Sequence, residues 1–169
     1  VTDGIREATG LEAAIKWPND VVVRGKKVAG ILTEMSTDLD RIEFVVIGIG
    51  INVNTDSFPE EIREVATSLA IEQGKETART PIIAAVWKQF ARYEKLFEEK
   101  GSFTALKERY EALLANRGRE VRVLDPDGEY CGVAEGITEG GELLVRREDQ
   151  SLTAVRSGEV SVRGIYGYI

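Results

Sequence analysis

Residues 14–34 have the sequence AIKWPNDVVVRGKKVAGILTE, and this stretch decides the fold class. Its short runs rich in Val, Ile and Leu, at 14–16, 21–24 and 28–33, are typical of strands. The short glycine-containing connection between the last two predicts that they pair as a hairpin. Further on, residues 44–49 form a continuous apolar run, which predicts a central strand buried on both faces. This part of the chain is therefore predicted to form a sheet whose loops carry the unusual residues.

Helices are predicted on either side of this sheet in the sequence. The chain opens within an amphipathic helix that ends at Gly10, and residues 59–70 also have helical character. Thr80 followed by Pro81 predicts the start of a longer helix, and Ser102 is predicted to cap another. The aromatic and aliphatic residues of these last two helices fall at three- and four-residue spacings. We predict that they belong to the core.

The composition changes at Gly118, where short alternating runs replace helical spacing. Turn signals such as 125–128 and 139–141 separate these runs at close intervals, which predicts a small β-barrel of about five strands. We predict two domains, residues 1–117 and residues 118–169, in an α+β fold. The predicted barrel strands are 119–124, 130–137, 142–147, 151–156 and 159–162.

The composition excludes several kinds of chemistry. The 169 residues contain no histidine and one cysteine. A Ser-His-Asp triad, an imidazole metal ligand and a multi-cysteine zinc site are therefore excluded, and we predict no metal-ligating residues. The formal charge of −7 argues against a generic nucleic-acid or anionic-membrane surface. No apolar run approaches the ~20 residues that a membrane-spanning helix needs. The single cysteine does not argue against a reducing compartment, so we expect a cytoplasmic protein.

Lys16 is the first candidate for chemistry. It leaves a strand into a turn fixed by Pro18, and this stiff support at the edge of the sheet would let its ammonium neutralise a carboxylate or a phosphate. The alternative is a lysine on a solvated turn, with Trp17 covering the core and the side chain of Asn19 or Asp20 closing the turn. The residues alone leave both interpretations open.

Glycines mark the second and third candidate strings. Gly30 lies in an otherwise apolar strand, where it costs stability unless something approaches the backbone closely; a bulge is the alternative. Gly48 and Gly50 alternate in the next strand, so one of its faces carries no side chains there and has room for a ring or a phosphate. Asn52 has the same spacing and is expected on that face. A dinucleotide-binding fingerprint is excluded here, because Pro59 precedes the helix that this motif requires.

Three strings in this order resemble the biotin protein ligase family, including the members that double as biotin operon repressors. They are KWPND at 16–20, KxxGILxE at 27–34 and GIGINVN at 48–54. The resemblance runs from Val1 to the C-terminus. It implies a catalytic core with the fold shared with class II aminoacyl-tRNA synthetases, followed by an SH3-like barrel. Lipoate ligases share the core fold, but KWPND followed by GIGIN at this spacing favours biotin.

The resemblance also implies an activity and its residues. Enzymes of this family activate biotin with ATP and Mg²⁺ to biotinyl-5'-AMP and transfer biotin to a lysine of a biotin carboxyl carrier protein, an acetyl-CoA carboxylase subunit. By position, Lys16 matches the catalytic lysine that contacts the biotin carboxylate and the α-phosphate. Gly30 and Gly48 match positions lining the biotin pocket. Asn52 matches an asparagine on the nucleotide side, and Lys27 matches a lysine near the phosphates.

One part of the family pattern is missing from this sequence. The family's Gly-Arg-Gly-Arg-type loop, its Ser/Thr segment and its biotin-contacting glutamine do not occur here. The resemblance therefore implies a catalytic domain that is incomplete at its N-terminus, and we expect little or no activity from this chain alone. The alternatives are a non-catalytic biotin- or nucleotide-binding module and an interaction module. A DNA-binding segment is not supported by this chain, and sheet-edge homodimers are known in the family.

Overall fold

The computed structural model describes residues 1–38, 41–125, 128–157, 161–164 and 168–169. Residues 126–127 of a predicted turn and 159–160 of the last predicted strand lie outside these ranges. The helices and strands follow the chain in this order: α1 (Thr2–Thr9), β1 (Ala13–Lys16), β2 (Asp20–Val23), β3 (Lys26–Asp38), β4 (Arg41–Ile51), α2 (Leu69–Gln73), α3 (Arg79–Lys100), α4 (Thr104–Leu113), β5 (Glu120–Leu124), β6 (Tyr130–Ile137), β7 (Leu143–Arg146), β8 (Leu152–Val155) and β9 (Ser161–Gly164).

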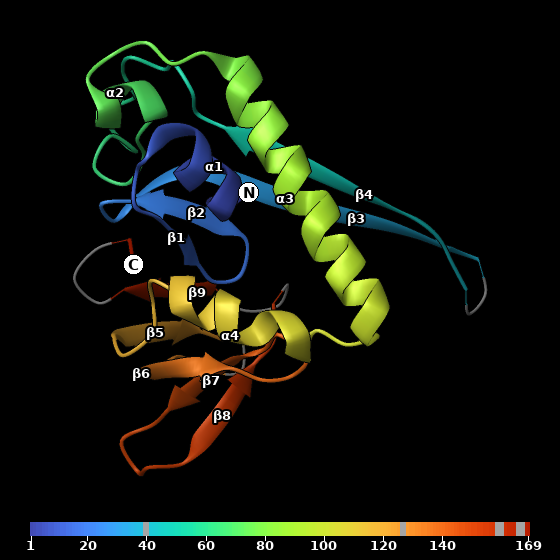
Figure 1. The fold of residues 1–169 in the computed structure, drawn as a ribbon. Coiled ribbons are helices and arrows are strands. Elements are labelled where there is room, and N and C mark those ends of the chain that lie inside the picture. Colours follow the sequence, from blue (N-terminus) through green and yellow to red (C-terminus); the bar gives the residue numbers. More distant parts are fainter. Residues whose placement is uncertain (39–40, 126–127, 158–160, 165–167) are drawn as a thin grey trace.

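The strands form two antiparallel sheets (Figure 1). The first has the order β1-β2-β3-β4, and α1 and α3 pack together beside it. The second has the order β8-β7-β6-β5-β9, and α4 contacts both sheets. Within the described ranges, no helix is long and apolar enough to cross a membrane.

The predicted hairpin is confirmed at β2 and β3. Val23 pairs with Lys26, so the turn consists of Arg24 and Gly25, whose φ angles are 49° and 81°. Positive φ at both central residues is the geometry that matches the twist of a two-residue hairpin, and Gly25 adopts it without steric cost. β3 and β4 run beyond their predicted ends and form a long ribbon that extends past the other elements in Figure 1.

The prediction of a central, doubly buried strand at 44–49 is wrong. Among the described residues β4 is the last strand of its sheet, and the apolar side chains of residues 44–49 are exposed, from 39% for Ile49 to 58% for Phe44. On one face, Val45 and Ile47 line an apolar groove with Trp87 of α3. The apolar run correctly indicates a surface that requires burial, but it does not identify the partner that would bury it.

The helical predictions are confirmed for α1 and are partly wrong elsewhere. α3 begins at Arg79, before the predicted cap, and its buried residues include Ile82 and Val86, whereas Trp87 is 66% exposed. The aromatic residues of α3 were therefore wrongly placed in the core. The apolar spacing predicted the helix correctly, but the buried side chains of α3 are Ile82, Ala85, Val86 and Gln89.

The segment 59–70 is mostly turns rather than a helix. Its backbone is paired with the start of β3 instead: the N–H of Lys27 donates to the Val65 carbonyl at 2.7 Å, and the N–H of Thr67 donates to the Lys27 carbonyl at 2.8 Å. The helix that begins at the end of this segment is the short α2. Ser68 is its N-cap, since the Ser68 Oγ accepts from the Ile71 N–H at 3.2 Å. Tertiary hydrogen bonds have overridden the local helical propensity.

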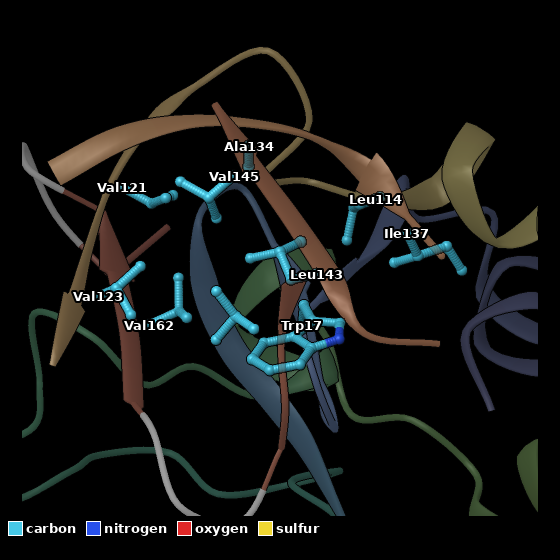
Figure 2. Close-up of a cluster of buried hydrophobic side chains, with 10 residues drawn as sticks. Trp17, Leu114, Val121, Val123, Ala134, Ile137, Leu143, Val145 and Val162 are labelled. Atoms are coloured by element: carbon cyan, nitrogen blue, oxygen red, sulfur yellow. The ribbon is translucent and has the colours of Figure 1, made fainter. Parts of the chain in front are cut away.

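The second sheet has the strands that the turn signals predicted, each within about two residues of the predicted ends. Its core is a cluster of Val, Leu, Ile and Ala side chains into which Trp17 inserts from the first sheet (Figure 2). Within the described part of the chain, the outer strands β8 and β9 do not pair with each other. The structure therefore shows a five-stranded antiparallel sheet, and the predicted closure into a barrel is not observed.

Candidate functional site

One row of residues crosses the first sheet at the end of the KWPND string. Lys16 lies opposite Asp20, Asp20 lies opposite Gly30, and Gly30 lies opposite Gly50. Residues directly opposite each other in adjacent strands project to the same face of a sheet. This face therefore presents a lysine and an aspartate next to two strands that carry no side chain in this row.

The turn that carries Lys16 is fixed by residues far away in the sequence. Trp17 is 1% exposed, its Nε1 donates to the Gly141 carbonyl at 2.9 Å, and its backbone N–H donates to the Asn116 Oδ1 at 2.9 Å. The Asn19 amide donates to the Ile31 carbonyl at 2.7 Å. Each of the two interpretations of the KWPND turn is therefore partly right. Trp17 covers a core, and Lys16 is held on a stiff support.

Lys16 is not a solvated turn residue. It is 7% exposed, and its Nζ lies 3.8 Å from the Asp20 Oδ2, a distance that allows charge attraction but is longer than a hydrogen bond. Burial lowers the pKa of Lys16, and nearby Lys27 and Arg163 lower it further, whereas Asp20 opposes this by raising it. The protein thus holds an ammonium group in a poorly solvated place.

Asp20 also binds Lys27 from β3. The Lys27 Nζ lies 2.5 Å from the Asp20 Oδ1, and Asp20 is 8% exposed. Gly30 makes this contact sterically accessible, because an added Cβ at Gly30 would lie 3.1 Å from the Lys27 Nζ. The close approach expected at Gly30 is therefore made by a lysine side chain, and the bulge of this strand pair lies next to Val22 rather than at Gly30.

A hollow of about 510 Å³ opens on this face of the sheet. Lys27 and Asp20 line it, and the Lys16 ammonium lies next to Asp20, so two positive charges near one carboxylate favour an anionic ligand. At Gly48 an added Cβ would meet only the Leu32 carbonyl, at 3.7 Å, so the space above this strand is open. The lining residues are Asn19, Asp20, Lys27, Gly30, Ile31, Leu32, Gly48, Ile49 and Gly50.

The structure brings most of the predicted site residues together and leaves one apart. Lys27, Gly30 and Gly48 line the hollow, and Lys16 joins it through Asp20. Asn52 lies outside this lining, and its amide donates to the Thr67 carbonyl at 3.1 Å. This contact gives Asn52 a structural role in holding the segment before α2.

Two residues of the site around Lys16 were not predicted from the sequence. Asp20 was considered only as a residue that closes the turn, although its place in KWPND gave a local signal. Tyr168 gave none: its ring centroid lies 4.3 Å from the Lys16 Nζ, and its hydroxyl donates to the Asp20 Oδ2. Tyr168 and Asp20 are 148 residues apart in the chain, so only the fold could reveal this contact.

Comparison with known proteins gives this site a context. Residues 1–52 match the Biotin/lipoate A/B protein ligase family, and residues 118–163 match the family described as Biotin protein ligase C terminal domain. The fold is similar to the crystal structure of biotin protein ligase from Aquifex aeolicus, with a TM-score of 0.85 and 36% identity, covering 96% of this chain and 70% of that chain. This chain belongs to the biotin protein ligase family.

Further relatives agree with membership of the biotin protein ligase family. The chain is 38% identical over 151 residues to the Bifunctional ligase/repressor BirA of Bacillus spizizenii, covering 88% of this chain and 46% of that protein. It is 32% identical to the Biotin--[acetyl-CoA-carboxylase] ligase of Paracoccus denitrificans, covering 79% and 56%. The Aquifex aeolicus enzyme in complex with biotin and ATP has a TM-score of 0.84 at 36% identity, covering 96% and 67%. The chain spans about half the length of these two sequence relatives.

Proposed function

We propose that this protein is an ATP-dependent biotin ligase and that this chain carries the lysine-lined part of its site. The proposed reaction forms biotinyl-5'-AMP and then transfers biotin to a lysine of a biotin carboxyl carrier protein. The observation that carries the proposal is the row from Lys16 and Asp20 to Gly30 and Gly50, beside the hollow that Gly48 also lines. A relative named Biotin--[acetyl-CoA-carboxylase] ligase and a related structure with biotin and ATP support it.

The proposed roles follow from charge and space. Lys16 would contact the biotin carboxylate and the α-phosphate, and Lys27 would lie near the other phosphates. Gly30 and Gly48 would let the biotin ring or the adenylate lie against the backbone. We also propose that Asn52 lies on the nucleotide side, and this role rests only on its position in the GIGINVN string.

The proposed first step requires little from the protein besides positive charge and alignment. A carboxylate oxygen of biotin attacks the α-phosphorus of ATP, a new P–O bond forms, and the bond to pyrophosphate breaks. The carboxylate is already ionised at neutral pH, so no general base is needed. The buried ammonium of Lys16 would stabilise the charge that develops on the phosphate oxygens, and it acts more strongly there than it would in water.

The Mg²⁺ that such enzymes use with ATP has no complete ligand set of its own here. Within the described residues, no group of three or more Cys, Asp or Glu side chains could hold a metal ion, and the nearby carboxylate, Asp20, is already paired with two lysines. These residues therefore do not fit a dedicated metal site. The proposal includes no step in which this chain holds the ion.

We also propose the finer architecture that the sequence predicts. Residues 1–117 would be the catalytic part, with the core shared with class II aminoacyl-tRNA synthetases, and residues 118–169 an SH3-like domain. The match of residues 118–163 to the C-terminal domain family supports this division. The cytoplasm as the place of action, and homodimers formed through a sheet edge, belong to the same proposal.

Calorimetry with biotinyl-5'-AMP tests the proposed function. We expect the chain to bind one molecule of the adenylate, because two lysines and an open hollow suit its phosphate and its ring. Biotin-dependent exchange of labelled pyrophosphate into ATP, measured on the same sample, would show a catalytically competent site, whereas binding without exchange agrees with the little or no activity expected of this chain alone. A chain that gives neither heat nor exchange would instead favour an interaction module.

Replacing Gly48 by leucine should block the hollow without unfolding the chain. The backbone at Gly48 tolerates a Cβ, with 3.7 Å to its nearest atom, so we expect the free energy of unfolding to change by less than about 1 kcal/mol. The longer side chain would fill part of the ligand space, and affinity for biotinyl-5'-AMP should fall by at least about tenfold. Gly48→Ala should give a smaller loss. Unchanged affinity in both variants would place the ligand elsewhere.

A further inference from the structure

Tyr168 contacts the Lys16 site from the other end of the chain. It follows β9, and the last residue, Ile169, packs closely over Gly164, where an added Cβ would clash with the Ile169 carbonyl. Ile169 also approaches the β2–β3 turn, since its Cδ1 would lie 3.7 Å from an added Cβ at Gly25. Residues 168–169 therefore lie against both sheets, which places Tyr168 beside Lys16 and Asp20.

The hydroxyl of Tyr168 donates a hydrogen bond to the Asp20 carboxylate, so that both carboxylate oxygens have partners. One oxygen of this buried carboxylate, Oδ1, pairs with the Lys27 Nζ at 2.5 Å. The other, Oδ2, accepts the Tyr168 hydroxyl and faces the Lys16 Nζ at 3.8 Å. Burial and Asp20 both raise the pKa of Tyr168, so its hydroxyl remains a donor at neutral pH. With both oxygens engaged, the carboxylate is held in one orientation between the two lysines.

We propose that Tyr168 is a positioning residue of the Lys16 site: its hydroxyl fixes Asp20, and Asp20 orients the ammonium groups of Lys16 and Lys27 toward the anionic ligand. The nature of that ligand, biotinyl-5'-AMP, rests on the proposed function. The positioning itself rests on the contacts of Asp20. Because the contact joins the C-terminal segment to the KWPND turn, it makes the arrangement of the site depend on the second sheet.

A double-mutant cycle tests this proposal. Asp20→Asn should lower the affinity for biotinyl-5'-AMP by about tenfold or more, and Tyr168→Phe, which keeps the ring over Lys16, by on the order of fivefold. If Tyr168 acts through Asp20, adding Tyr168→Phe to Asp20→Asn should cost less than about twofold. Equal losses in both backgrounds would show an independent role and overturn the proposal. Higher affinity in Tyr168→Phe would show that the tyrosine obstructs the ligand, which also overturns it.

A second measurement needs no ligand and therefore separates this proposal from the proposed function. Acetic anhydride labels deprotonated lysines, and mass spectrometry gives the labelling of Lys16 as a function of pH. Among the described residues, the charged and titratable groups that act on Lys16 are Asp20 of β2, Lys27 of β3, Arg163 of β9 and Tyr168.

The expected order of the labelling curves follows from these charges. Asp20 raises the pKa of Lys16, so Asp20→Asn should move the curve to lower pH. Tyr168→Phe should move it in the same direction by less, because the released carboxylate can turn toward Lys27. In the Asp20→Asn background, Tyr168→Phe should leave the curve unchanged.

A curve that does not move in the Tyr168→Phe variant would overturn the proposal, even if the adenylate binds. If the curves move as expected but the chain binds no adenylate, the positioning role stands and the proposed function fails. Tyr130→Phe is the matched control, since Tyr130 lies in β6 against Arg147 and should change neither affinity nor labelling. Urea unfolding of each variant checks that the fold is intact.

Discussion

Replacing Lys16 by methionine should lower the affinity of the chain for biotinyl-5'-AMP by about 100-fold, because the ligand loses a charge-assisted partner worth roughly 2 to 3 kcal/mol. Methionine keeps most of the buried volume, so the loss reports the missing charge rather than a cavity. Asp20 retains Lys27 and Tyr168 as partners, which limits the cost of leaving its carboxylate buried. Calorimetry gives the affinity, and biotin-dependent pyrophosphate exchange should fall with it if the chain is active.

Lys26→Met is the matched control for this prediction. Lys26 is the neighbour of Lys27, but its Nζ donates to the Arg63 carbonyl at 3.1 Å and it does not line the hollow. This variant changes the net charge as Lys16→Met does, so the general electrostatic effect on an anionic ligand is the same. We expect less than about a twofold change in affinity. Equal losses in the two variants would mean that Lys16 acts only through the overall charge and would remove it from the proposed role.

The pH dependence of binding should follow the protonation of Lys16. Its pKa is lowered chiefly by burial, so its ammonium loses its proton at a lower pH than a solvated lysine does. Affinity for an anionic ligand should therefore fall as the pH rises through that lowered pKa, and it should be constant below it. Lys16→Met should lack this alkaline loss. Calorimetry across the alkaline range gives both curves.

Local signals predicted the strands of the second sheet well. The Gly140 and Gly141 turn separates β6 from β7, and alternation over 130–137 matches β6 at both ends. The β2–β3 hairpin was likewise visible, because Gly25 supplies a backbone conformation that a two-residue turn requires. These features depend on residues that are close in the sequence, so a single sequence contains their cause.

Features that depend on distant partners could not be predicted. The apolar run of β4 requires burial, but its sequence does not state what covers it, and Val46 remains 50% exposed. The segment 59–70 makes local turns, and its end at Val65 and Thr67 pairs with Lys27 of β3 instead of continuing as a helix. In the site, Lys16 and Lys27 were found from strings, whereas the hydroxyl of Tyr168 reaches Asp20 only through the fold.

Trp17 also connects the site to the second sheet, because its Nε1 donates to the Gly141 carbonyl. The KWPND string presents Lys16 on one side and buries Trp17 on the other, in a cluster that includes Val145 and Leu143 (Figure 2). Trp17→Ala should lower the free energy of unfolding by about 3 to 5 kcal/mol, because it leaves a large cavity in a closely packed core. The turn would lose its anchor, and affinity for the adenylate should fall as well.

The second tryptophan of the chain provides the control. Trp87 on α3 is 66% exposed, against 1% for Trp17, so Trp87→Ala should cost less than about 1 kcal/mol in urea unfolding. Trp17→Phe refines the test, since it keeps an aromatic ring but removes the Nε1 donor to the Gly141 carbonyl. We expect it to fall between the wild type and Trp17→Ala in stability. If Trp17→Ala and Trp87→Ala cost the same, the second sheet would not support the Lys16 turn, and the dependence of the site on that sheet would be wrong.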